Sequence, residues 1–361
     1  MNDIELNDFL QNLPSLVQHK SLAIYRLPNS TETHIVIGDA QEIKSLAEVL
    51  ASDGFAFLPS EGSPQYKPFL ILPEQQWQLT DTNSLLLLEL KVPFSSIPPI
   101  ISSQSDYLVQ AQSIVDATQA GEAEKAILSR IKTQPISDFN PGLTFQKLCD
   151  TYSTVMVYWV SIPGVGTWLG ATPETLIKLD GGVAETIALA GTQAETGLAL
   201  EKVTWGQKEL REQQIVSDNI EGLIREYFPA EKIYIDGPNT TSTGALLHLR
   251  TTYRWHIPQD VSALESFLLS LHPTPAIAGH PKEAALDLIA KIEPHERAYY
   301  TGLLGPVNRH GLTHLFVNLR CMQVFDGQLA LYLGGGITAA SDPMAEWHET
   351  ELKAQTLLRV V

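Results

Sequence analysis

The N-terminal part of the chain is built from short apolar runs separated by turn-forming residues. Runs of this kind predict β-strands. They fall at residues 22–27, 34–37, 55–58 and 69–72. Apolar residues at helical spacing predict helices near residues 3–19 and 40–51. The Pro- and Ser-rich stretch 93–105 is interpreted as a connection.

Helical patterns and hairpins share the rest of the chain. The helical patterns fall at residues 105–120, 144–152, 206–227, 282–291 and 342–358. A strand is predicted at residues 125–131, and Asp180-Gly181-Gly182 and Asp326-Gly327 each separate two apolar runs, which predicts two β-hairpins. Because strands outnumber helices and many of them are joined by hairpins, we expect an α+β protein with large antiparallel sheets.

The net charge of the chain limits the classes of partner that it can bind. The sequence has 41 acidic and 24 basic residues among 361, a formal net charge of −17. A surface this acidic repels nucleic acids and anionic lipids, so we expect neither as a partner. If the protein binds an acidic metabolite, it needs a divalent metal or a few well-placed Arg and Lys side chains to offset the repulsion.

The cysteines and the apolar segments of the sequence indicate where in the cell the protein is expected. Cys149 and Cys321 are far apart and form no CxxC pair, which argues against a zinc cluster or a disulfide scaffold and fits a reducing compartment. The chain begins with neither the basic nor the apolar segment of a signal peptide. It also has no apolar run near the roughly 20 residues that span a bilayer. We expect a soluble cytoplasmic protein.

Two predicted helices carry carboxylates three residues apart. Glu346 and Glu349 lie about 60° apart around the last helix, and Lys353 almost eclipses Glu346. Glu209 and Glu212 repeat the spacing on another helix. Two such pairs facing each other would form an all-oxygen site suited to Mg²⁺. The alternative, which is more common for acidic helix faces, is plain solvation.

A run of three glycines, Gly334-Gly335-Gly336, precedes the last predicted helix and is expected at the end of a strand. Its bare amides could cradle an anion near the helix N-terminus. A tight turn explains the same run, and the spacing is not a dinucleotide-binding fingerprint.

Four further side chains could carry chemistry. Lys125 begins the strand-like segment KAILSR and is either a base or an exposed edge lysine. Glu174 follows Pro173 in GATPETL and is either a general acid or an exposed strand residue. His248 alternates with leucines and is either a hydrogen-bonded, half-buried histidine, the more common case, or a catalyst. Arg320 lies in the predicted strand FVNLRCMQV, where it needs a carboxylate partner from protein or ligand.

Taken together, the segments of residues 107–358 resemble the chorismate-utilising enzymes. This family includes isochorismate synthase, salicylate synthase and the large subunits of anthranilate and aminodeoxychorismate synthases. The matching segments, in family order, are EKAILSR, GATPETLI, ETIALAGT, KELREQ, LHPTPAIAG, IEPHERAYYTGLLG, VNLRCMQV and LYLGGGITAASDPMAEWHETELKAQTLL. The resemblance implies the family fold, with large antiparallel sheets and helices packed outside. We expect one domain over residues 1–361, with a variable β-rich part at 1–104 and the catalytic motifs at 105–361.

Three positions indicate the branch of the family. Lys125 matches the lysine that activates water for attack on the chorismate ring. Ala190 stands where aminodeoxychorismate synthases of the covalent type carry a lysine. Ala276 matches the small residue of isochorismate synthases, whereas salicylate-forming relatives tend to have a threonine. The resemblance therefore implies an isochorismate synthase that acts on chorismate as a monomer, without a glutaminase subunit.

The resemblance also implies a role for each site residue. Lys125 would be the base that deprotonates water, and Glu174 the acid that protonates the departing C4 hydroxyl. Mg²⁺ would be ligated by Glu212 and Glu349, with its waters held by Glu209 and Glu346. The substrate would be bound by Arg320, Gly334 and Lys353 at the enolpyruvyl carboxylate, by Gly191 and Thr192 at the ring carboxylate, and by His248, Ala276 and Tyr300 beside the ring. Gln213 stands where the family often has His, so a charge at that position is lost.

Three alternatives stay open at this point. A salicylate synthase would add pyruvate elimination in the same pocket, and Ala276 argues against it. A non-catalytic chorismate-binding protein would lack Lys125 or Glu174, and both are present. An ammonia-transferring subunit would depend on ammonium. Isochorismate itself feeds menaquinone, catechol siderophore and salicylate biosynthesis.

Overall fold

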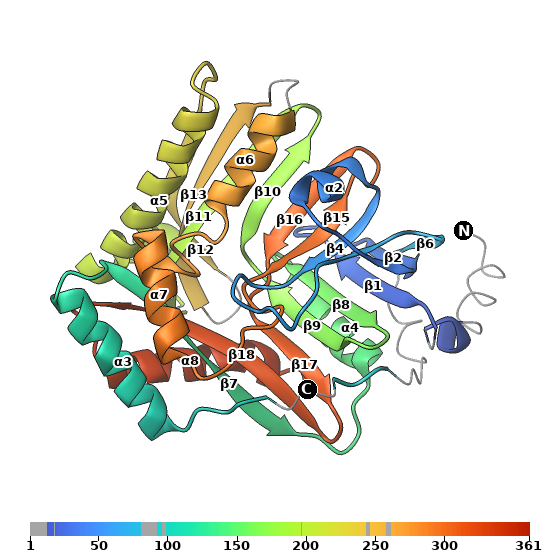
Figure 1. Ribbon diagram of the computed structural model, residues 1–361, viewed down its shortest axis with the longest axis horizontal. Helices are drawn as coiled ribbons and strands as arrows, with labels where there is room; N and C mark the ends of the chain where they lie inside the picture. The colour runs from blue at the N-terminus through green and yellow to red at the C-terminus, as the bar shows by residue number, and fades with distance from the viewer. Residues whose placement is uncertain are drawn as a thin grey trace.

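The computed structural model describes residues 13–17, 19–80, 92–95, 99–195, 197–242, 246–257 and 261–361. Two nine-stranded sheets form the framework of this part of the chain (Figure 1). The strand pairings that the structure describes are antiparallel. The predicted class, α+β with large antiparallel sheets and helices packed outside, is confirmed.

The two sheets have the following strand orders. The first sheet runs β14 (Gly279–His280), β7 (Lys125–Pro135), β18 (Gln328–Thr338), β17 (Cys321–Phe325), β9 (Gly166–Thr172), β8 (Met156–Ile162), β1 (Ser21–Arg26), β2 (Thr33–Gly38), β6 (Gln75–Leu79). The second sheet runs β12 (Tyr234–Ser242), β13 (Leu246–His256), β11 (Val183–Ala194), β10 (Thr175–Asp180), β16 (Leu312–Val317), β15 (Leu303–Val307), β4 (Gly54–Leu58), β5 (Phe69–Ile71), β3 (Ala40–Glu42). Strands from the N-terminal part of the chain complete one end of each sheet.

Alternating side chains explain why the sheets stack. Along β1, Leu22 and Ile24 face an outer core while Ala23 and Tyr25 face the core between the sheets. This is the period of two that a strand buried on both faces shows. The core between the sheets is aromatic. Phe57 stacks on Tyr299, with ring centroids 4.1 Å apart.

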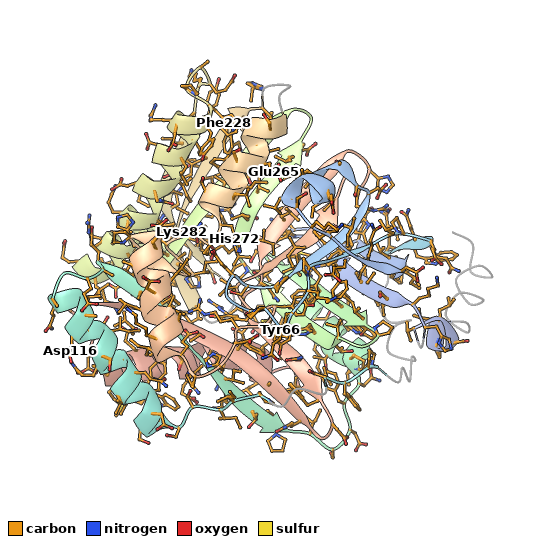
Figure 2. The ribbon with its side chains drawn as sticks, in the orientation of Figure 1. Tyr66, Asp116, Phe228, Glu265, His272 and Lys282 are labelled. Carbon is orange, nitrogen blue, oxygen red and sulfur yellow. The ribbon has the colours of Figure 1, made fainter. Side chains whose placement is uncertain are left out.

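The helices cover the outer faces of the sheets. They are α2 (Leu46–Ala51), α3 (Gln104–Gln119), α4 (Pro141–Thr151), α5 (Gln207–Tyr227), α6 (Val261–Leu271), α7 (Lys282–Ile292) and α8 (Pro343–Leu358), with a short 3₁₀ turn at Leu200–Lys202. The helices α5 and α6 pack on the second sheet, where Phe228 meets Phe267 and Trp255 (Figure 2). The helices α3, α7 and α8 pack around β7 and β18. No helix in the described part of the chain is long and apolar enough to cross a membrane.

Most of the predicted elements are present. The N-terminal strands, both hairpins and the helices α3, α4, α5, α7 and α8 are confirmed to within a few residues. Asp342 caps α8 through a bond from the Ala345 N–H to its side chain. The helix expected over residues 40–51 is confirmed only as α2, because Ala40–Glu42 pairs with β5 as a strand. Most of the helix expected near residues 3–19 lies outside the described residues. The stretch 93–105 is described only in part, and α3 already begins at Gln104.

Two predictions about strands are wrong. Gly334-Gly335-Gly336 does not end a strand but lies inside β18, opposite Ser129, Leu128 and Ile127 of β7. Arg320 is not in the middle of a strand. It lies at the break between β16 and β17, with φ 48°. The chain passes from one sheet to the other at this break, which interrupts the apolar alternation that predicted one strand.

Candidate active site

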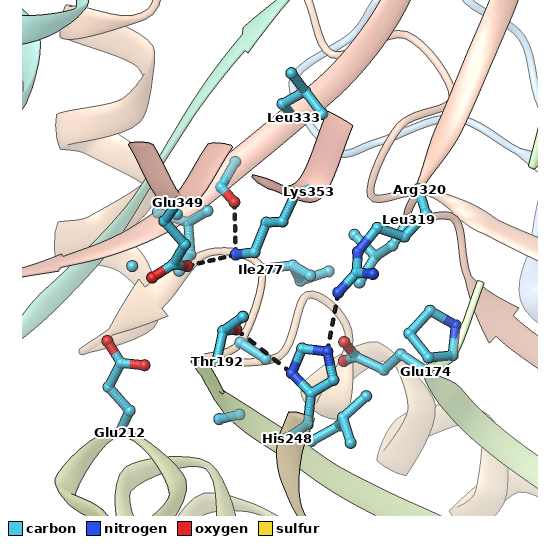
Figure 3. Close-up of a pocket in the computed structure, with 18 of the residues that line it drawn as sticks. Glu174, Thr192, Glu212, His248, Ile277, Leu319, Arg320, Leu333, Glu349 and Lys353 are labelled. Atoms are coloured by element: carbon cyan, nitrogen blue, oxygen red, sulfur yellow. Dashed lines mark hydrogen bonds and ion pairs between the residues drawn. The ribbon is translucent and has the colours of Figure 1, made fainter. Parts of the chain in front are cut away.

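A pocket lies where chain segments pass from one sheet to the other (Figure 3). About 740 Å³ of it is free of protein atoms, including its open mouth, a volume within the range of small-molecule sites. All of the predicted site residues line it except Glu209 and Glu346. Its apolar walls were not predicted, because single apolar residues carry no functional signal. These walls include Ile127, Leu189, Ile277, Leu319 and Leu333.

Glu174 reaches the pocket from the connection between β9 of the first sheet and β10 of the second. Pro173 breaks the first strand, and the Glu174 carbonyl accepts from the Val317 N–H at 2.9 Å, which holds the backbone. The side chain is 3% exposed and accepts from Thr274 Oγ1 at 3.3 Å. Burial raises the pKa of Glu174 to about 7, although Thr274, Lys125 and Arg320 oppose the rise. A carboxyl group of this kind is protonated often enough at neutral pH to act as an acid.

Lys125 begins β7 and is 2% exposed, so the edge-lysine alternative is excluded. The position of the Lys125 side chain depends on the absence of a side chain at Gly336 in the neighbouring strand β18. A Cβ on Gly336 would lie 2.7 Å from Lys125 Cε and 3.2 Å from Glu212 Oε1. The lysine and the carboxylate thus share the space that this glycine leaves free.

The other two glycines of the run also make room for side chains. A Cβ on Gly334 would lie 2.6 Å from the Tyr300 hydroxyl, and one on Gly335 would lie 3.3 Å from Glu346 Oε2. The Gly334 carbonyl accepts from Lys353 Nζ at 2.9 Å rather than from β7. In an antiparallel ladder the N–H and C=O of one residue point to the same edge. The Gly334 amide therefore faces the lysine side, where an anion can reach it.

Arg320 and His248 lie on the same side of the pocket as Glu174 (Figure 3). His248 Nδ1 donates to the Gly191 carbonyl at 2.9 Å, so Nε2 accepts from Arg320 Nη2 at 3.0 Å. Burial and the charge of Arg320 lower the pKa of His248 to about 3. A neutral histidine thus holds a buried guanidinium without neutralising it, and leaves the charge available for a carboxylate of a ligand.

The opposite side of the pocket carries Glu212 and Glu349 (Figure 3). Glu349 contacts Lys353 Nζ at 2.7 Å. Burial raises the pKa of Glu349, but the ammonium groups of Lys353 and its neighbours outweigh burial and hold it below the usual value. Glu346, 1% exposed, pairs with Lys208, and burial together with the charge of Glu349 raises its pKa.

The predicted metal set is only partly assembled around the pocket. Glu209 lies on the first turn of α5, and its carboxylate turns toward Gly206 of its own helix. Within the described residues, no three His, Cys, Asp or Glu side chains are grouped as a ready-made metal site. One observation does favour a cation. Glu346 Oε2 is buried without a hydrogen-bond partner, and oxygen donors of this kind suit Mg²⁺.

Two contacts of the site residues were missed by the sequence reasoning. Thr274 binds Glu174, and Lys208 binds Glu346. Both lie inside segments that had been singled out, LHPTPAIAG and KELREQ. A hydroxyl and an ammonium group near predicted carboxylates are therefore the signals that could have found them.

The chain matches a protein family and several known proteins. A family model described as chorismate binding enzyme matches residues 33–361. Isochorismate synthase EntC of Escherichia coli is 30% identical over 251 residues, which is 67% of this chain and 63% of EntC. Anthranilate synthase component 1 of Streptomyces coelicolor is 33% identical over 67% of this chain and 48% of the relative. The chain thus spans less than two thirds of the length of these relatives.

The fold has matches among solved structures. The DhbC protein of Bacillus anthracis superimposes with a TM-score of 0.79 at 24% sequence identity, and the match covers 98% of each chain. The likeness extends over the N-terminal strands, where the motifs of the sequence do not reach. On the family match over residues 33–361, the chain belongs to the chorismate-binding enzymes.

Proposed function

We propose that this protein is an isochorismate synthase, which converts chorismate to isochorismate. The observation that carries the proposal is the pair formed by a buried lysine, Lys125, and a buried carboxyl group, Glu174, whose pKa is about 7, in one pocket. Addition of water at one carbon and loss of hydroxyl at another need a base and an acid at separate places. Relatives that carry the same activity in their names support the choice.

The proposed reaction adds one water molecule to the ring and removes another. Lys125 takes a proton from a water molecule, and the water oxygen bonds to C2 of the ring. The ring double bond shifts, and the C4 oxygen leaves as water with the proton of Glu174. One water is consumed and one is released, and the proton on Lys125 returns to Glu174 through solvent before the next turnover. The substrate and product are therefore isomers.

The remaining residues bind the two carboxylates of chorismate. Arg320, held by His248, and the Gly334 amide would bind the enolpyruvyl carboxylate, with Lys353 beside them. Gly191 and Thr192 would lie along the ring carboxylate. The positive charges at these positions supply the local attraction that a protein of net charge −17 needs.

Mg²⁺ fits the carboxylate side of the pocket. Glu212 and Glu349 would hold it, with Glu346 close by, because their oxygens surround the space next to Gly335 and Gly336. When bound there, the ion would neutralise the ring carboxylate. Lys208 and Lys353 now pair with two of these carboxylates, so we propose that they yield them to the metal. A role for Glu209 stays a prediction.

The test is a product assay. Purified protein is incubated with chorismate and Mg²⁺, with and without ammonium, and the products are separated and identified by mass. We expect one product with the mass of chorismate, no pyruvate and no effect of ammonium. Salicylate with pyruvate would identify a salicylate synthase. An aminated product would indicate an ammonia-using enzyme, and binding without turnover a chorismate-binding protein.

The matched variants are Lys125→Ala and Glu174→Gln. Each should lower kcat by about 10²–10⁴-fold, the usual contribution of an acid or base, while the protein stays folded. Thr33→Ser, in a buried position of β2 away from the pocket lining, is the control that should keep its activity. If either variant keeps more than about a tenth of the wild-type kcat, its assigned role is wrong.

A further inference from the structure

A buried ion pair lies directly behind the pocket wall. Arg297 and Glu293 are four residues apart in the segment IEPHER, which follows α7, and their side chains are 7% and 3% exposed. Arg297 donates to Glu293 through Nη2 at 2.7 Å and through Nε at 2.9 Å. Buried ion pairs contribute little net stability on average, because desolvation offsets the attraction. The remaining hydrogen bonds of the pair point to a second role.

These remaining bonds reach the backbone of two pocket segments. Arg297 Nη2 donates to the Ile127 carbonyl at 2.9 Å, and Nη1 donates to the Ile277 carbonyl at 2.8 Å. Glu293 Oε1 accepts from the Ser129 N–H at 2.6 Å. Ile127 and Ile277 both line the pocket. One guanidinium therefore ties strand β7 to the turn that follows α6.

Each tied segment carries one half of the acid–base pair. Lys125 lies two residues before Ile127 on β7. In the turn, the N–H of Ile277 donates to the Thr274 carbonyl at 3.0 Å, and Thr274 Oγ1 donates to Glu174. The outer end of the turn is fixed independently, because Lys282 donates to the His272 carbonyl at 2.8 Å (Figure 2).

We propose that Arg297, oriented by Glu293, is a positioning residue that sets the separation between Lys125 and the Thr274–Glu174 contact. The roles of Lys125 and Glu174 rest on the proposed function. The planar guanidinium presents several N–H donors in a fixed fork, so it can bind both carbonyls and the carboxylate at once. A lysine in its place keeps the charge but has no such fork. The two segments would then be joined only by backbone bonds, such as the one from the Ile127 N–H to the Ala278 carbonyl at 2.8 Å, and their side chains would be held less exactly.

The chain offers a matched control. Arg26 is as buried as Arg297, each being 6% exposed over the whole residue, and it donates to the carbonyls of Cys149 and Tyr152 away from the pocket lining. We expect Arg297→Lys and Arg26→Lys to lose similar amounts of stability in chemical unfolding. Only Arg297→Lys should lose kcat, by about 10²-fold, the cost of a misplacement near 1 Å. Its KM should change less than its kcat, because Arg320 and Gly334 are untouched.

A second measurement distinguishes a positioning role of Arg297 from a general loss of rigidity in the variant. Glu174 faces Thr274, Lys125 and Arg320. The Thr274 bond favours the ionised carboxylate, so its loss raises the pKa of Glu174. The alkaline limb of the pH–rate profile should therefore move to higher pH in Arg297→Lys and in the reference variant Thr274→Val, but not in Arg26→Lys.

The outcomes are distinct. If Arg297→Lys matches Arg26→Lys in both kcat and the alkaline limb, the positioning role is wrong. If Arg297→Lys does not fold, Glu293→Gln takes its place with the same expectations. If the wild-type protein does not turn over chorismate, the proposed function fails. In that case the pKa of Glu174 can be measured by carbon NMR of glutamate-labelled protein, with the signal assigned by means of Glu174→Gln. If this pKa does not rise in Arg297→Lys, the inference about Arg297 is overturned.

Discussion

Glu174 and Glu349 line the same pocket, yet their surroundings push their pKa values in opposite directions. Glu174 has a hydroxyl as its hydrogen-bond partner, and burial dominates. Glu349 contacts an ammonium group, which outweighs burial. Pairs of carboxyl groups separated in this way serve as acid and as charged ligand in many enzymes. The first therefore suits proton donation and the second suits a cation.

The protonated form of Glu174 should set the alkaline limit of the reaction. Because the acid form is the active one, kcat/KM should fall as pH rises through about 7. A pH–rate profile in buffers of constant ionic strength measures this limb. A rate that stays flat well above that pH would mean that another group donates the proton.

Glu174 should also cost stability at high pH. Its folded pKa of about 7 lies above the ordinary 4.5, so the folded state binds the proton more tightly than the unfolded state does. The stability from this group is full below pH 4.5 and is lost as pH rises through about 7, on the order of 3 kcal/mol in total. Glu174→Gln should lack this loss, and its Tm advantage over wild type should grow between these pH values. A constant difference in Tm would contradict the raised pKa.

Strand β18 is the element that organises the pocket. Its three glycines face Tyr300, Glu346 and Lys125 in turn, so groups from three other segments can approach this stretch of the strand, where it has no side chains. Three successive glycines weaken a strand, because glycine stabilises strands poorly. The pairing of β18 with β7 along the whole length of β18 compensates for this weakness.

Substitution of one glycine should separate function from stability. Gly336→Ala places a methyl 2.7 Å from Lys125 Cε and should abolish turnover. Gly222→Ala, in the exposed middle of α5 with nothing within 4 Å, should leave turnover unchanged. It should also raise the free energy of unfolding by about 0.5–1 kcal/mol, because alanine favours helices. Full activity in Gly336→Ala would show that Lys125 can move without consequence.

Patterns among neighbouring residues predict most helices and hairpins of this protein, but not the features that depend on contacts between distant segments. The hairpin at Asp180-Gly181-Gly182 and the cap at Asp342 depend on neighbouring residues, so the sequence reveals them. The strand Ala40–Glu42 depends on β5, and no prediction covered α6. The positive φ of Arg320 depends on two sheets meeting. The proposed catalytic positions come from ordered motifs. Arg297 instead binds backbone carbonyls, which no sequence pattern displays.

At the scale of the whole molecule, charge opposes the proposed substrate. A net charge of −17 repels a dicarboxylate and attracts Mg²⁺. Under the proposed function, binding would therefore depend on short-range contacts at Arg320, Lys353 and Gly334 rather than on the overall field.

Salt should consequently affect the two ligands in opposite directions. Screening over a Debye length of about 10 Å at 0.1 M weakens both the repulsion and the attraction. Raising the KCl concentration should lower KM for chorismate and raise the apparent Kd for Mg²⁺. Steady-state kinetics and calorimetric titration measure the two quantities. A KM that rises with salt would show that the positive pocket residues control the approach of the substrate.

The interleaving of early and late strands in both sheets also dictates the order in which the protein can assemble. On the ribosome, β4 emerges long before its partner β15, and β7 is joined to the rest of its sheet only when β17 and β18 arrive. Until then strand edges stay open, the condition in which chains associate wrongly. In a nascent chain that stops before β17, β7 with Lys125 is not yet joined to β9, the strand that leads to Glu174, so the proposed catalytic pair comes together only with the last part of the sequence.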